Sequence, residues 1–103
     1  MRKYKLVVKK GIELIDDYYL QCENSNKKDW KKSIDLNQLD MRKGGVCILG
    51  QLFGYYYSGV DILDLDNDQC HKYGFDVLDL NEFDEQKYNR QYQDLTKEWK
   101  RQL

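Results

Sequence analysis

The side chains best suited to metal binding follow the middle of the chain. Asp64, Asp66 and Asp68 alternate along the sequence, a spacing typical of calcium-binding loops. A loop of that kind also needs glycine at its sixth position and glutamate at its twelfth, where this chain has Gln69 and Phe75. The sequence therefore disfavours calcium, and we expect neither a metal ion nor a cofactor.

The cysteines offer two further kinds of chemistry. Adjacent Cys70 and His71 carry groups that zinc prefers, but neighbouring residues rarely chelate one metal ion. Cys47 lies near the predicted start of a helix, where a thiol can acquire a lowered pKa and become a nucleophile. Burial as a small apolar residue is the alternative for each cysteine. We favour burial and no enzymatic activity, because the chain has a single histidine and no other catalytic grouping.

A basic turn precedes the uncharged middle of the chain. Arg42, Lys43, Gly44 and Gly45 could hold an anion through backbone N–H groups at a helix start, or could simply form a turn. The phosphate-binding pattern Gly-x-x-x-x-Gly-Lys-Ser/Thr is absent from the sequence, which excludes a nucleotide P-loop.

The net charge of −1 conceals an uneven distribution. Residues 46–86 contain one lysine and nine acidic residues, and basic segments lie on either side. The acidic segment 61–85 is either a solvated rim or a surface that resembles nucleic-acid phosphate and would occupy a basic groove on a nuclease. We select one tyrosine and six aspartates as partner-binding candidates: Tyr55, Asp61, Asp64, Asp66, Asp68, Asp76 and Asp79.

These candidates must be positioned by a central element, which we expect at residues 46–60. This run has no charged residue, and its spacing predicts one helix with a broad apolar face. Tyr55 would lie opposite that face, where exposed tyrosine is often a binding hot spot, unless the terminal helix buries it. Gly50, Gly54 and Ser58 would form a row of small residues for close packing, within one chain or across a homodimer. The apolar face comprises Val46, Leu49, Gly50, Phe53, Tyr56, Tyr57 and Val60.

Two amphipathic helices should flank the central one. Apolar residues recur at helical spacing over residues 8–21 and again from residue 88 to residue 103, where Asn81 is a candidate N-cap upstream. Residues 3–8 alternate polar and apolar, so they could instead form a strand, and residues 4–8 could form a minor hairpin with residues 73–78. Between the helices, Trp30 should anchor its polar loop on the core. We predict one mainly α domain over residues 1–103, with three principal helices, irregular connections and, as an option, that hairpin.

Four groups of residues carry a resemblance to known proteins. The pattern is Trp30…Ile34-Asp35-Leu36…Leu39-Asp40, then Cys47-x-Leu49-Gly50-Gln51-Leu52-Phe53-Gly54-x-Tyr56-x-x-Gly59, then Tyr73-Gly74-Phe75-Asp76, then Leu95-Thr96-x-x-Trp99. With this pattern the chain resembles a group of small proteins from phages and prophages over most of residues 8–99. That group has no settled activity, so the resemblance implies a setting and no catalytic residues.

Three function classes follow from these observations. The first is a phage accessory protein that binds a host protein in the cytoplasm and inhibits a CRISPR effector or another defence nuclease. The second is a nucleic-acid-binding protein, which the sequence pI of about 5.8 disfavours. The third, an enzyme, is the least supported. The uncharged run is also too short for a bilayer, so we expect no membrane association. The basic residues of the second class are Lys9, Lys10, Lys27, Lys28, Lys31, Lys32, Arg42 and Lys43.

Overall fold

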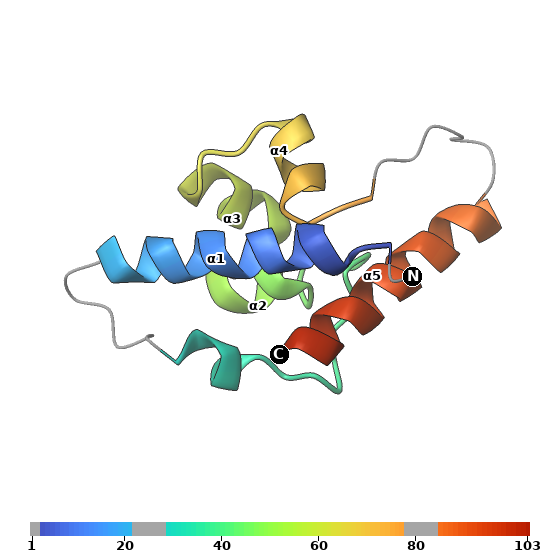
Figure 1. The fold of residues 1–103 in the computed structure, drawn as a ribbon, viewed down its shortest axis with the longest axis horizontal. Helices are drawn as coiled ribbons and strands as arrows, with labels where there is room; N and C mark the ends of the chain where they lie inside the picture. The colour runs from blue at the N-terminus through green and yellow to red at the C-terminus, as the bar shows by residue number, and fades with distance from the viewer. Residues whose placement is uncertain (1–2, 22–28, 78–84) are drawn as a thin grey trace.

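The computed structural model describes residues 3–21, 29–77 and 85–103, and within these ranges the chain is mainly α-helical, as predicted (Figure 1). The described elements exceed the three principal helices expected, and no strand occurs among them. The elements in chain order are α1 (Lys5–Gln21), the 3₁₀ helix η1 (Trp30–Ser33), α2 (Ile48–Phe53), α3 (Tyr56–Ile62), α4 (Asn67–Lys72) and α5 (Glu85–Gln102).

Helix α1 begins before the expected boundary, and this excludes the strand and hairpin proposed for residues 3–8. The Val8 amide donates to the Tyr4 carbonyl at 3.0 Å, so the first turn is already helical. The alternation that suggested a strand has a helical explanation, because Tyr4 and Val8 share one face while Leu6 is 68% exposed. Gly74 does lie against the backbone of Val7 and Val8, but as a turn packed on a helix.

The central run is two short helices, so the prediction of one rod over residues 46–60 is wrong. Gly54 has a φ of 96° and ends α2, its amide bonding to the Gly50 carbonyl. Tyr55 is extended, and the Tyr56 amide donates to the Gly44 carbonyl at 2.8 Å, so α3 starts in a new direction. Hydrophobic spacing could not reveal this break, because all the side chains around it are uncharged.

The break changes which faces are buried. Leu49 is fully buried and Phe53 and Tyr56 are half-buried, as expected, but Tyr57 is 66% exposed although it was placed on the apolar face. The two glycines of the predicted row also differ in their surroundings. A Cβ at Gly50 would collide with the Gly44 carbonyl oxygen, whereas Gly54 faces open space. Only the first of these two glycines serves close packing.

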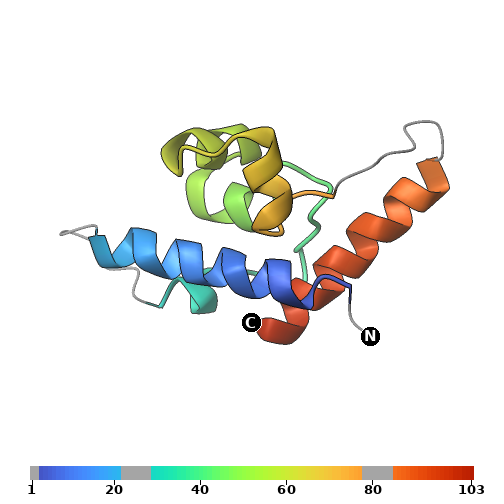
Figure 2. The same ribbon diagram turned by 45° about the horizontal axis from the view of Figure 1, so that its top comes forward.

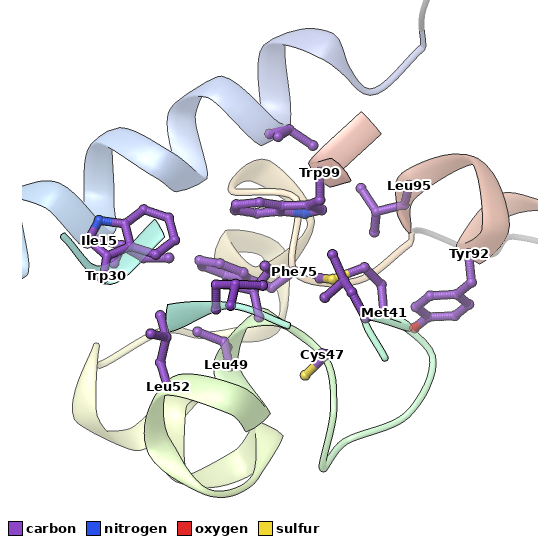
Figure 3. Close-up of a cluster of buried hydrophobic side chains, with 14 of the residues drawn as sticks. Ile15, Trp30, Met41, Cys47, Leu49, Leu52, Phe75, Tyr92, Leu95 and Trp99 are labelled. Atoms are coloured by element: carbon purple, nitrogen blue, oxygen red, sulfur yellow. The ribbon is translucent and has the colours of Figure 1, made fainter. Parts of the chain in front are cut away.

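Helices α2, α3 and α4 lie on one side of α1 (Figure 2). Helix α5 crosses α1, and the C-terminal part of α5 lies near the N-terminal part of α1. Figure 3 shows the core between them, where the Trp99 ring lies over Phe75. The predicted stripe of α5 is confirmed, since Leu95 and Trp99 are fully buried and Tyr92 is 9% exposed. Asn81 lies outside the described residues.

The irregular segment before α2 is held on the core by polar contacts as well as by burial. Trp30 is 1% exposed, as predicted, and its indole N–H donates to Asp16 of α1 at 2.8 Å. The Thr96 hydroxyl donates to the Tyr92 carbonyl and accepts from the Met41 amide at 2.9 Å. These bonds fix the chain leading into residues 41–44 against α5.

Substitution of Gly11 tests the crossing of α1 with its neighbours. A Cβ there would collide with the Tyr73 carbonyl oxygen and lie 3.0 Å from the Trp99 ring. We expect Gly11→Ala to lower the free energy of unfolding by about 1–3 kcal/mol through overpacking, despite the roughly 1 kcal/mol that alanine gains in a helix. Urea unfolding measures the change. Gly45→Ala is the control, because no atom lies within 4 Å of a Cβ there. Equal stabilities for the two variants would contradict the packing described.

Candidate functional site

A pocket of about 270 Å³ opens between α3, α5 and the loop of residues 41–44. Tyrosine dominates its walls, and one basic and one acidic side chain face it from different segments. We call it the tyrosine pocket. Its lining residues are Met41, Arg42, Gly44, Tyr55, Tyr56, Tyr57, Phe75, Asp76, Tyr88 and Tyr92.

The first wall exists because the chain breaks at Gly54. Tyr55 precedes α3 as its N-cap and Tyr57 lies in the first turn, and their ring centroids are 5.9 Å apart. Tyr55 rests against Gly44, where a Cβ would lie 2.9 Å from the ring. The residues Tyr55 and Tyr57 remain 51% and 66% exposed. Two large aromatic side chains are therefore presented to solvent at the rim.

Helix α5 supplies the opposite wall. Tyr88 and Tyr92 are one turn apart and meet edge to face at 5.0 Å, with their hydroxyls 3.4 Å apart. The guanidinium carbon of Arg42 lies 5.3 Å from the centroid of the Tyr88 ring. This distance is within the range of a cation–π contact. One aromatic face of the pocket therefore already holds a guanidinium group.

Asp76 brings a carboxylate to the pocket wall. Its Oδ2 accepts from the Tyr56 hydroxyl at 3.2 Å, and its Oδ1 forms an ion pair with His71 Nδ1. Burial raises the pKa of Asp76, against the opposing effects of His71 and Tyr56. Burial also raises the pKa of Tyr56, and the nearby Cys70 and Asp76 add to this effect. The result is a polar network linking α3, α4 and the residues that follow α4.

The network does not make Cys70 a nucleophile. Cys70 is 2% exposed, and burial raises the pKa of its thiol, so the reactive thiolate is disfavoured at neutral pH. His71 pairs with Asp76 and so belongs to a different contact. Cys47 is the N-cap of α2, and its sulfur accepts from the Gly50 amide at 3.3 Å. Burial raises its pKa too, which favours a structural role over the lowered pKa considered from the sequence.

The residues considered as metal or anion ligands have other local roles. Asp66 caps α4 in a capping box with Gln69, and Asp64 adopts a φ of 55° in the preceding turn. In the part of the chain that the structure describes, no three His, Cys, Asp or Glu side chains are grouped to hold a metal ion. Residues 42–45 form a turn whose Gly44 carbonyl accepts from Tyr56.

The structure brings together two of the seven predicted partner-binding residues. Tyr55 and Asp76 both line the tyrosine pocket, although Asp76 is half-buried and paired instead of freely exposed. Asp79 lies outside the described residues. The other four are exposed along α3, α4 and the turn between them: Asp61, Asp64, Asp66 and Asp68.

Sequence reasoning missed several residues of this site. Tyr88 and Tyr92 were recognised only as core positions of α5, and Tyr57 only as part of an apolar face. The fact that these residues are tyrosines could have indicated a pocket, because the tyrosine hydroxyl tends to remain near water when the ring is buried. Arg42 was considered only as part of an anion-binding turn.

Comparison with protein families, with curated proteins and with solved structures yields no match for this chain. The resemblance to phage proteins therefore stays a prediction. Among the described residues, no helix is both long and apolar enough to cross a membrane.

The phenols of Tyr56 and Tyr92 predict a loss of stability at high pH. Burial raises the pKa of both Tyr56 and Tyr92 above the ordinary value of 10.0. Above pH 10 the unfolded chain releases these protons while the folded chain retains them, so the free energy of unfolding falls as pH rises. Each phenol adds a slope of up to about 1.4 kcal/mol per pH unit, less where solvent screens the charge.

Urea unfolding of wild type and Tyr92→Phe between pH 8 and pH 11.5 measures this effect. We expect the variant to lose part of the slope above pH 10 and none of it at pH 8, where Tyr92 is protonated in both states. Parallel curves for the two proteins above pH 10 would contradict the burial of this phenol.

Proposed function

We propose that this chain is a phage or mobile-element accessory protein that binds a host protein and inhibits a defence nuclease, such as a CRISPR effector. The observation that carries the proposal is the pair of exposed tyrosines, Tyr55 and Tyr57, at the rim of a tyrosine-lined pocket beside an acidic surface. The phage setting is supported by the sequence resemblance alone.

The tyrosine pocket has the properties of a protein-binding surface. Tyrosine is enriched in binding hot spots because it buries much area, loses little side-chain entropy and retains a hydrogen-bonding group. Tyr57 meets Tyr56 edge to face at 5.2 Å, which limits the ring's freedom before any partner arrives. A partner would therefore bind to rings that are already ordered.

The acidic surface supports a basic partner. Asp61, Asp64, Asp66 and Asp68 are all exposed, while Lys72 is the only lysine or arginine between residues 61 and 77. Such a surface attracts lysine and arginine side chains and speeds encounter, and the effect weakens as salt is added. A nuclease groove that normally holds nucleic-acid phosphate is a partner of this kind.

Nucleic-acid binding is the alternative function. It would use exposed lysine and arginine side chains of α1, η1 and the following turn, whereas Lys27 and Lys28 lie outside the described residues. The acidic surface would repel phosphate, which is why we rank this function second. The exposed basic residues are Lys9, Lys10, Lys31, Lys32, Arg42 and Lys43.

A DNA-cleavage assay with a panel of purified CRISPR effector nucleases tests the proposal. We expect the chain to slow cleavage by at least one of them, less effectively at high salt. Tyr57→Ala should raise the half-inhibitory concentration about 30-fold, the effect of losing a hot spot of about 2 kcal/mol. Leu6→Ala is the control, because Leu6 is also exposed but lies in α1, away from the pocket.

A gel shift at low salt separates the two functions. The proposal requires little retardation of DNA by the chain alone. Tight DNA binding together with no inhibition of any nuclease in the panel would reject it in favour of the alternative.

A further inference from the structure

We propose that the tyrosine pocket binds a quaternary ammonium group, the trimethylammonium head of a small molecule or of a methylated lysine side chain. This inference goes beyond the proposed function, because it assigns a ligand chemistry to the pocket whether or not the partner is a nuclease. It can be tested with small model compounds.

Aromatic rings form most of the pocket walls. Six of the ten lining residues are aromatic, and five of these six are tyrosines. The face of an aromatic ring carries partial negative charge, so several rings around one cavity attract a cation whose surface is apolar. Trimethylammonium groups are recognised in this way by clustered aromatic side chains. The walls therefore supply the attraction that a quaternary ammonium ion needs.

The exposed aromatic surface of the pocket lies on its α3 side. Tyr55 and Tyr57 are 51% and 66% exposed, and their ring centroids are 5.9 Å apart. Tyr57 also meets Tyr56 edge to face at 5.2 Å, which holds its ring in place. The Arg42 guanidinium keeps its position 5.3 Å from the centroid of Tyr88, on the α5 side. The guest would therefore bind beside the α3 tyrosines without displacing Arg42.

The Asp76 carboxylate gives the pocket wall a negative charge, which offsets the charge of Arg42. Asp76 also contributes to the raised pKa of Tyr92, so its charge acts on the α5 wall as well. Asp61 is exposed one helical turn beyond Tyr57 in α3, and it adds negative potential at the rim. An anionic ligand would meet the same carboxylates and is disfavoured.

The contacts of Asp76 favour a quaternary ammonium ion over a primary one. Its Oδ2 accepts from the Tyr56 hydroxyl at 3.2 Å, and its Oδ1 pairs with His71. A lysine ammonium brings three N–H donors and a strong hydration shell, which the pocket would have to replace. A trimethylammonium group has no donor, so it needs none of the acceptor positions that Tyr56 and His71 occupy.

NMR titration of the ¹⁵N-labelled chain with choline at low salt tests the inference. We expect saturable shifts of the amides of Tyr55, Tyr57 and Asp76. The matched control is the carbon isostere of choline, in which a tert-butyl group replaces trimethylammonium, so the shape is kept and the charge is lost. The isostere should bind about tenfold more weakly, as expected for cation–π contacts with more than one ring. Equal binding of the two compounds, or no saturable shift with choline, would overturn the inference.

Two substitutions of Tyr57 separate the ring from its hydroxyl. Tyr57→Phe keeps the aromatic face and should leave choline binding within about twofold of wild type. Tyr57→Leu keeps an apolar side chain without an aromatic face and should weaken binding about fivefold. Tyr57 is exposed, so both variants should fold, and their spectra report whether they do. Equal choline binding by the two folded variants would exclude the ring face as the binding group and reject the proposal.

The two sources of the group are distinguished by a second titration, with N-acetyl-trimethyllysine methylamide. Tighter binding of this compound than of choline would identify a modified side chain as the source, and the reverse order a free small molecule. The unmethylated lysine counterpart should bind several-fold more weakly than the trimethylated form. Equal binding of the two lysine forms would reject the preference for a quaternary ion.

The two proposals can fail separately. Choline binding without inhibition of any nuclease in the panel would leave this inference standing and count against the proposed function. Nuclease inhibition that depends on Tyr57, without binding of either trimethylammonium compound, would retain the function and overturn this inference.

Discussion

The fold depends on the placement of one indole ring. Trp99 of α5 is fully buried, stacks on Phe75 at 5.9 Å and donates its N–H to the Gly74 carbonyl at 2.7 Å. The same ring lies against Gly11 of α1, so three segments distant in sequence meet at one side chain. Gly74 has a φ of 72°, which glycine adopts at little cost, and this turn brings its carbonyl to the indole.

The tyrosine pocket follows from the same arrangement. Phe75 contacts Trp99 and also lines the pocket, and Asp76 comes directly after it, so the carboxylate is positioned by the core contact. Along α5 the buried face runs from Trp99 through Tyr92 to Tyr88, and exposure increases toward the start of the helix. The core therefore passes into the pocket along one helix face, and tyrosine replaces apolar side chains where water begins to reach the rings.

The sequence predicted the elements whose information is local. The stripes of α1 and α5 repeat at helical spacing and appear as predicted, and Trp30 and Phe75 pack in the core. The break at Gly54 was not predicted, because it depends on a backbone conformation and on a backbone hydrogen bond between Tyr56 and Gly44. Neither of these alters hydrophobic spacing. The pocket was not predicted from the sequence, because its lining residues extend from position 41 to position 92 and only the tertiary structure brings them together.

The burial of Asp76 has a cost for the stability of the fold. Its raised pKa means that the charged form loses more by desolvation than it recovers from His71 and Tyr56, so this charge reduces the stability of the fold. An uncharged side chain could have accepted the Tyr56 hydrogen bond without that cost. The carboxylate lines the pocket, where it accepts from Tyr56 and pairs with His71. The group that joins α3 to α4 therefore also sets the charge of the pocket wall.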